Sequence, residues 1–406
     1  RKGLVVLSLS INLGLLVYFK YTNFLGGVIA SLMGGEFTAL DIFLPVGISF
    51  FTFQSLSYTI DVYRRDIKPL TNLLDYAFYV SFFPQLVAGP IVRARDFIPQ
   101  IRKPLFVSQE MFGRGIFLIV SGLFKKAIIS DYISINFVER IFDNPTLYSG
   151  VENLMGVYGY ALQIYCDFSG YSDMAIGIAL LLGFHFNLNF NSPYKSASIT
   201  EFWRRWHISL TTWFRDYIYI PLGGSRAGKW KSFRNTLVIF LVSGFWHGAN
   251  WTFVAWGAYH ALLFLPLLLL GQNRRYRDSV AENSFLPSVK ELTQMGATFL
   301  LVLLGWILFR SEDISQAAVY LERMFNVSLF SAPQLVGLGF GQLLLKKCFF
   351  FTALMFIVEW IGRKQAHGLM IEDLSLPVRY VIYTVLLIII YGFDASNPQG
   401  FIYFQF

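Results

Sequence analysis

Long apolar stretches run through almost the whole of this chain, and they limit what it can fold into. About 20 apolar residues let a helix cross a bilayer, where backbone polar groups must be bonded within the segment. Residues Gly296 to Phe309 with their flanks, and Pro377 to Phe393, are two such stretches. The hydrophobic share of 55% also exceeds that of soluble domains. The sequence predicts an all-α, polytopic integral membrane protein with roughly eight to eleven spans.

Positive charge is concentrated at the ends of these stretches. The chain has 33 Lys and Arg against 25 Asp and Glu, a net charge of +8. Basic pairs occur at 64–65, 125–126 and 363–364. Such placement is typical of anchoring to the inner leaflet of the bilayer. Nucleic-acid binding would need a basic stripe on a soluble domain, and the sequence contains none, so we exclude it.

The remaining global features indicate a single domain. Cys166 and Cys348 lie in apolar surroundings, which predicts neither a disulfide framework nor a cysteine metal site. No linker, low-complexity tract or repeat divides the chain, so residues 1–406 are predicted to form one transmembrane domain. Because the chain starts at Arg1 without Met, we expect an N-terminal part of the full protein to be missing.

Two histidines occupy the densest polar and aromatic stretches, His207 in EFWRRWHISL and His247 in SGFWHGANW. An ionisable residue inside a membrane is costly, so function is the default hypothesis for both. We expect helices at Ile199 to Ile220 and Lys231 to Gly257, joined by a Gly-rich turn, so that the histidines face one another. His260 is predicted to point away from the face that carries His247.

General base catalysis is the chemistry that these histidines fit best. No carboxylate or cysteine stands at ligand spacing from either one, so no metal is predicted. A serine-nucleophile turn and a phosphate-binding loop are also missing from the sequence. An imidazole base would suit acyl transfer from a thioester, with the Trp246 indole or Asn250 as donors to the oxyanion. The alternative, that both histidines are structural and satisfied by carbonyls, stays open here.

Several charged residues need partners or a role. Asp167 and Asp173 lie within the long apolar stretch from Val151 to Phe186, where unpaired carboxylates are costly. Three arginines are expected either to pair with them, to bind an anionic donor, or to lie at the cytoplasmic interface: Arg204, Arg205 and Arg215. Asp216 or Asn250 is expected to hold a histidine tautomer.

Four motifs give the chain a resemblance to a known family. They are LPVGISFFTFQ at 44–54, FFPQLVAGPI at 82–91, FWRRWHISLTTWFRDYIYIPLGG at 202–224 and FWHGANW at 245–251. The chain resembles the membrane-bound O-acyltransferase (MBOAT) family, in the bacterial branch that contains the alginate O-acetyltransferase membrane subunit. The resemblance extends from Leu44 to the terminal FIYFQF.

The resemblance implies a fold and an activity. The fold would be a ring of tilted transmembrane helices around a central funnel in the bacterial inner membrane. His247 would be catalytic and His207 would support it. The donor would be acetyl-CoA or another acyl thioester, with no permanently bound cofactor. A periplasmic SGNH-type acetyltransferase partner would pass the acetyl group to an exported polysaccharide such as alginate.

Two other functional classes stay open. A transporter or flippase predicts paired discontinuous helices in related halves, and no such repeat is visible. A non-catalytic scaffold of a polysaccharide-export complex predicts that both histidines are dispensable.

Overall fold

The computed structural model describes residues 2–226, 228–272, 280–335, 341–365, 371, 374–392 and 400–402, and between 341 and 349 it describes the side chain of Lys346 alone. The described residues form helices and no strands, which confirms the all-α prediction. The α-helices are α1 (Lys2–Leu16), α2 (Thr22–Leu32), α3 (Ile48–Arg64), α4 (Leu73–Ser81), α5 (Phe83–Leu86), α6 (Ala94–Ile101), α7 (Gln109–Leu123), α8 (Asp131–Ile133), α9 (Glu139–Asp143), α10 (Gly150–Leu181), α11 (Ile199–Arg205), α12 (Ile208–Phe214), α13 (Lys229–His247), α14 (Trp251–Leu269), α15 (Val289–Arg310), α16 (Ile314–Met324), α17 (Gly341–Ile361) and α18 (Leu376–Gly392). Short π-helical segments extend four of these helices: η1 (Val17–Tyr21), η2 (Phe124–Ser130), η3 (Ser134–Val138) and η6 (Arg215–Tyr219).

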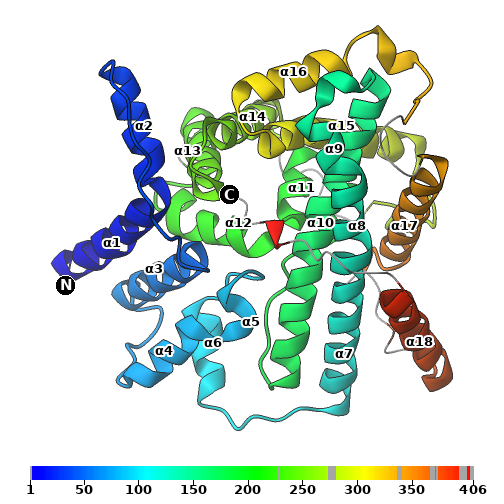
Figure 1. The fold of residues 1–406 in the computed structure, drawn as a ribbon. Helices are drawn as coiled ribbons and strands as arrows, with labels where there is room; N and C mark the ends of the chain where they lie inside the picture. Colours follow the sequence, from blue (N-terminus) through cyan, green and yellow to red (C-terminus); the bar gives the residue numbers. More distant parts are fainter. Residues whose placement is uncertain are drawn as a thin grey trace.

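The helices surround a centre that holds α11 and α12 (Figure 1). Helices α3, α10, α13, α14 and α15 lie around these two, whereas α1, α2 and α18 lie at the edges of the view. Such an arrangement agrees with a ring of helices. The central funnel stays a prediction.

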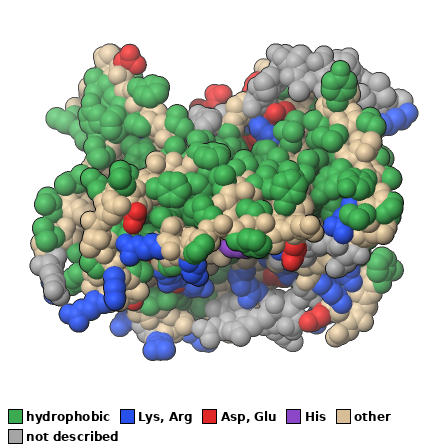
Figure 2. Space-filling model, turned by 90° about the horizontal axis from the view of Figure 1, so that it is seen from below, with side chains coloured by type: hydrophobic (Ala, Val, Ile, Leu, Met, Phe, Trp, Pro, Cys, Tyr) green, Lys and Arg blue, Asp and Glu red, His purple; other side chains and the backbone are tan. Residues whose placement is uncertain are grey.

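The apolar surface is that of a membrane protein. Three described helical stretches are long and apolar enough to cross a bilayer, namely Lys2–Leu32, Trp251–Leu269 and Val289–Arg310. They are fewer than the roughly eight to eleven spans expected from composition. The stretch predicted at Gly296 to Phe309 lies inside α15, as expected. In Figure 2 apolar side chains form a belt across the molecule, and basic side chains gather along one edge of it.

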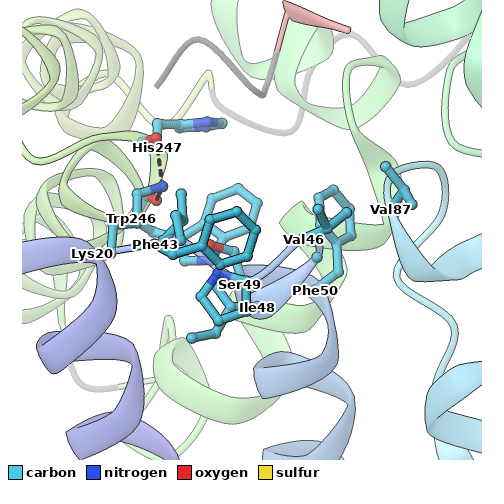
Figure 3. Close-up of a pocket in the computed structure, with 12 residues that line it drawn as sticks. Lys20, Phe43, Val46, Ile48, Ser49, Phe50, Val87, Trp246 and His247 are labelled. Carbon is cyan, nitrogen blue, oxygen red and sulfur yellow. Dashed lines mark hydrogen bonds between the residues drawn. The ribbon is translucent and has the colours of Figure 1, made fainter. Parts of the chain in front are cut away.

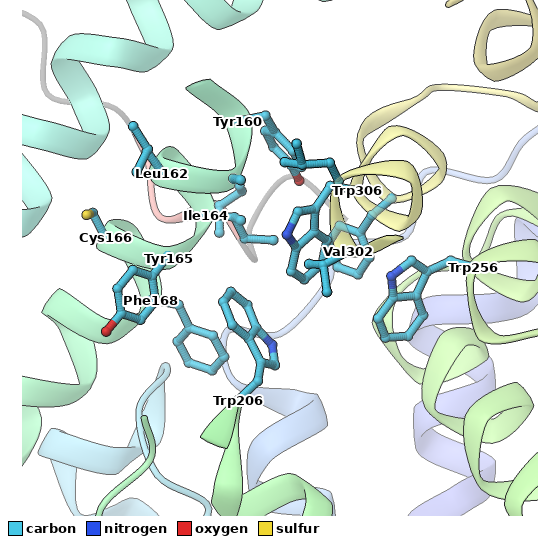
Figure 4. Packing of buried hydrophobic residues seen from close by; sticks show 14 of the residues in the cluster. Tyr160, Leu162, Ile164, Tyr165, Cys166, Phe168, Trp206, Trp256, Val302 and Trp306 are labelled. Atoms are coloured by element: carbon cyan, nitrogen blue, oxygen red, sulfur yellow. The ribbon is translucent and has the colours of Figure 1, made fainter. Parts of the chain in front are cut away.

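The core beside α11 and α12 is aromatic. Trp206 and Trp306 have ring centroids 4.9 Å apart, and Trp256 stacks on Trp306 at 6.4 Å. Figure 4 shows Trp206 beside Phe168 and Tyr165 of α10, and its ring centroid lies 6.1 Å from that of Tyr165. Large rigid rings fix the positions of the helices that carry them, because packed aromatic pairs resist displacement.

Helices α7 and α10 approach closely through glycines. A Cβ added to Gly170 would lie 2.6 Å from the carbonyl oxygen of Gly122, and one added to Gly177 would lie 2.6 Å from that of Gly115. Small residues at such contacts let two backbones meet, and this is a common way for helices to associate in membranes.

Gly170→Ala is therefore expected to destabilise the protein by about 1–3 kcal/mol, because the added methyl group overpacks this contact. Gly113→Ala is the matched control. Gly113 lies in α7 with open space around it, so alanine there should be neutral or stabilising. Thermal unfolding in detergent compares the two variants. Equal midpoints would show that the α7–α10 contact is not tight.

Two ion pairs tie η2 to α10. Lys125 Nζ lies 2.7 Å from Asp173 Oδ2, and Lys126 Nζ lies 2.6 Å from Asp167 Oδ1. The prediction that arginines at 204, 205 and 215 pair with these carboxylates was wrong, as was the placement of the two lysines at a segment end. The reason is topological: η2 continues α7, which packs along α10, so the nearest cations come from that helix.

Candidate active site

His207 lies at a break between two helices. We predicted one helix from Ile199 to Ile220, but α11 ends at Arg205 and α12 begins at Ile208. His207 itself adopts the left-handed conformation, with φ 43° and ψ 56°. This conformation is uncommon outside glycine and often marks a functional site. The prediction of one continuous helix through His207 was therefore wrong.

The network around His207 fixes its tautomer. Asn189 Nδ2 donates to Ser172 Oγ at 3.0 Å, so Asn189 Oδ1 faces His207 and accepts from Nδ1–H at 3.0 Å. Because Nδ1 then carries the proton, Nε2 holds a lone pair. Nε2 is buried and has no hydrogen-bond partner among the described residues. The structure therefore contains a buried imidazole whose acceptor nitrogen is available.

His247 ends α13. The predicted helix from Lys231 to Gly257 is interrupted there, and α14 starts at Trp251 after a short turn. His247 and His260 thus belong to different helices, and the prediction that separated them by helical face does not apply. Their rings both contact Trp256, at centroid distances of 5.3 and 5.1 Å.

Trp246 joins the two candidate histidines. Its ring centroid lies 4.9 Å from that of His247 and 6.4 Å from that of His207. The indole stacks on Phe53 of α3, at 5.1 Å, which holds it in place. Both imidazoles therefore contact one buried aromatic ring, as expected for residues of a single site.

A cavity of about 260 Å³ reaches His247 from the side of α3. Figure 3 shows Lys20, Ser49, Trp246 and His247 on its wall. The side chain of Lys20 enters from η1 and donates to the carbonyl oxygens of Trp246 and His247, at 2.9 and 2.8 Å. The walls are otherwise mostly apolar, and lining residues such as Phe43 and Val46 are exposed.

A second cavity, of about 310 Å³, is lined by three arginines: Arg93, Arg95 and Arg215. Ser209 also lines it, and Ser209 Oγ lies 3.4 Å from His207 Nδ1. Arg93 Nη2 is buried with no hydrogen-bond partner in the part of the chain that the structure describes. We call this space the arginine cavity. Its unused donor and its charge suit an anionic group.

Asp216 organises the arginine cavity. Its carboxylate lies 2.5 Å from Arg93, 3.4 Å from Arg95 and 2.7 Å from Arg215. Burial alone would raise the pKa of Asp216, but hydrogen bonds from Arg215 and Arg93 outweigh it and lower the pKa to about 2. The carboxylate stays ionised at neutral pH. Asp96 also lines the cavity, and three guanidinium groups against these two carboxylates leave one positive charge.

The other predicted site residues lie elsewhere. Arg204 is exposed, and Arg205 pairs with Glu201 at 2.9 Å. Asn250 Oδ1 accepts from the Thr252 N–H and caps α14, and Asn250 Nδ2 donates to the Glu312 carbonyl oxygen. Both polar atoms of the Asn250 amide therefore bond to groups other than the histidines. Asn189 takes the tautomer-holding place that we expected for Asp216 or Asn250.

Sequence reasoning missed Lys20, Asn189, Arg93 and Arg95. Lys20 has the pattern of an interfacial lysine, and Asn189 lies in a polar loop with no local motif. Arg93 and Arg95 follow FFPQLVAGPI directly, so the end of that motif was the one indication available.

Comparison with known proteins gives the chain a family. The model of the family described as "MBOAT, membrane-bound O-acyltransferase family" matches residues 64–285. The chain is 42% identical to the probable alginate O-acetylase AlgI of Pseudomonas aeruginosa over 84% of its own length and 65% of the relative. It is 37% identical to the peptidoglycan O-acetyltransferase of Helicobacter pylori, over 80% of the chain and 65% of the relative.

A third relative is more distant. The teichoic acid D-alanyltransferase of Bacillus subtilis is 29% identical, over 66% of the chain and 69% of the relative. The chain spans about two thirds of the length of these curated relatives. More than half of the chain fits the family model, and the motifs that it shares hold both candidate histidines. The chain belongs to the membrane-bound O-acyltransferase family.

Proposed function

We propose that the protein is an O-acetyltransferase of the bacterial inner membrane. It takes an acetyl group from a cytoplasmic thioester donor, acetyl-CoA, and passes it across the membrane for O-acetylation of an exported polysaccharide such as alginate. The observation that carries the proposal is that the buried imidazoles of His207 and His247 both contact the Trp246 ring. His247 lines one cavity, and His207 contacts Ser209 on the wall of the arginine cavity. The names of the relatives support the acyl-transfer class.

The chemistry needs one proton acceptor and an electrophile. His247 takes the proton of the attacking hydroxyl as its oxygen bonds to the thioester carbonyl carbon. The tetrahedral intermediate then collapses, the C–S bond breaks, and the proton passes to the thiolate that leaves as free CoA thiol. His207 orients the reacting hydroxyl through Nε2, because its Nδ1–H is held by Asn189. Trp246 keeps the two imidazoles at fixed separation.

The arginine cavity is the proposed site of the donor's phosphates. Phosphate groups suit guanidinium donors, which bind two oxygens at once. Ser209 connects this cavity to His207, so a donor anchored at the arginines would extend its thioester arm toward the imidazoles. The cavity beside His247 would then receive the acceptor or the periplasmic SGNH-type partner that carries the acetyl group onward.

A turnover assay tests the proposal against the two other classes. Purified protein in nanodiscs is given acetyl-labelled acetyl-CoA together with the partner and an alginate oligosaccharide, and release of CoA thiol is followed. An acyltransferase releases thiol in proportion to protein and acceptor. A transporter or a scaffold would leave the thioester intact, and that result in folded protein would overturn the proposal.

Charge reversal in the arginine cavity tests whether the donor's phosphates bind there. The double variant Arg95→Glu, Arg215→Glu is expected to raise the KM for acetyl-CoA roughly 10-fold. The reason is that each of these two exposed cations contributes about 0.2–1 kcal/mol to an ion pair with the donor. The KM for a short acetyl thioester without phosphates should stay unchanged. Arg102→Glu with Lys103→Glu is the control, since both residues are exposed and neither lines the cavity. An equal rise in KM for both thioesters would contradict phosphate binding there.

A further inference from the structure

The N-terminal helices pack against α3, where Ser8 Oγ lies 3.1 Å from Thr59 Oγ1, and they make a second contact at η1. Within α1, η1 and α2 the buried residues are Leu16 and Tyr21 alone, and most of the remaining surface is exposed. Both buried residues lie in or next to η1. A π-helical turn places an extra residue in the helix and is often found at functional sites. Lys20 also belongs to this turn, so the contact at η1 carries a cation into the membrane region, where charge is costly.

The target of η1 is the end of α13. The last four carbonyl groups of any helix have no partner within it, and most helices satisfy them with a backbone cap. Gly248 follows α13 in an extended conformation, with φ −163°, and no backbone N–H caps the helix among the described residues. The carbonyl groups at the end of α13 therefore need donors from elsewhere.

Two neighbouring side chains of η1 supply those donors. Tyr21 donates its hydroxyl to the carbonyl oxygen of Phe245 at 2.8 Å, and its ring stacks on Phe245 at a centroid distance of 4.2 Å. Lys20 donates to the carbonyl oxygens of Trp246 and His247 at 2.9 and 2.8 Å. Three successive carbonyl groups, ending at His247, are held from one turn of a separate helix. A cation at a helix C-terminus is also favoured by the helix dipole.

We propose that Lys20 and Tyr21 form a clamp that positions His247 for acyl transfer. This inference rests on the proposed function of His247. Lys20 acts through the backbone of the histidine and is a positioning residue. The clamp is what the helix end has in place of a backbone cap, so its loss would let the last turn of α13 fray and move the imidazole in the cavity. Shifts of about 1 Å in a reacting group can cost about 10²-fold in rate.

The test uses a matched pair of lysines. Lys229 donates to the carbonyl oxygen of Leu269 near the end of α14 at 2.8 Å, so it makes the same kind of contact at another helix end. Lys20→Met is expected to lower kcat about 10²-fold with little change in the KM for acetyl-CoA, whereas Lys229→Met leaves kcat unchanged. Lys20→Arg, which keeps the charge and the donors, should recover most of the rate. Tyr21→Phe keeps the stack, and it should lower kcat by less than Lys20→Met does.

Several results would overturn the clamp. An unchanged kcat in Lys20→Met, with His247→Ala inactive, would refute the clamp and leave the proposed function intact. A raised KM with normal kcat would assign Lys20 to donor binding instead. If Lys20→Met does not fold, the kcat values of Lys20→Arg and Tyr21→Phe test the clamp instead. A wild-type kcat in Tyr21→Phe would refute the contribution of the Tyr21 hydroxyl. Full activity in His247→Ala would instead refute the proposed function on which the clamp rests.

Discussion

His247→Ala should lower the rate of acetyl transfer by about 10²–10⁴-fold, because a positioned general base contributes that much to proton transfer. The KM for the donor should change little, since His247 does not line the arginine cavity. Initial rates of CoA thiol release, with labelled acetyl-CoA and acceptor, measure the effect.

The control is a histidine outside the site. His185 is exposed in the loop before α11, where its backbone N–H bonds to Gln100, so His185→Ala should keep the wild-type rate. Size-exclusion profiles and unfolding midpoints of both variants must match the wild type. A His247→Ala protein that is folded and no slower than His185→Ala would remove His247 from the chemistry.

Asn189→Ala should lower kcat by about 10²-fold through His207. Without the Asn189 oxygen, the proton of His207 is free to move to Nε2, and the imidazole loses both its tautomer and its orientation. The variant also loses the bond that the Asn189 amide donates to Ser172 and the one that it accepts from the Ser209 hydroxyl. Initial rates against donor concentration separate kcat from KM.

Asn187→Ala tests the specificity of that effect. Asn187 lies two residues earlier in the same loop, is exposed and bonds to Asp96 at 3.4 Å. Asn187 also lines the arginine cavity, so its loss is expected to act on the KM for acetyl-CoA and to leave kcat unchanged. Equal effects of the two substitutions would mean that the loop as a whole, and not the tautomer of His207, sets the rate.

The sequence predicted the helical fold, the membrane character and the two stretches that hold His207 and His247. Local patterns carry this information, because apolar length and aromatic motifs are read within one segment. The break at His207 was not predictable from such patterns. Trp203, His207 and Leu210 keep helical spacing across it, and the left-handed residue there is not a glycine.

The break after His247 could have been predicted from the sequence. Gly248 and Asn250 stand where one helix ends and the next begins, and Asn is a preferred N-cap residue. Partners distant in sequence could not be predicted in the same way. Lys20 lies 226 residues from Trp246 in the sequence. Asp167 pairs with Lys126 and not with an arginine because α7 packs along α10.

The central claim, transfer of an acetyl group across the membrane through His247, is tested most directly in sealed vesicles. The protein is inserted with the arginine cavity facing outward, labelled acetyl-CoA is added outside, and the SGNH-type partner with an alginate oligosaccharide is enclosed inside. The account predicts labelled ester on the enclosed oligosaccharide with wild-type protein and at least 10²-fold less with His247→Ala. Equal labelling by the two proteins, or thiol release outside with no label inside, would contradict it.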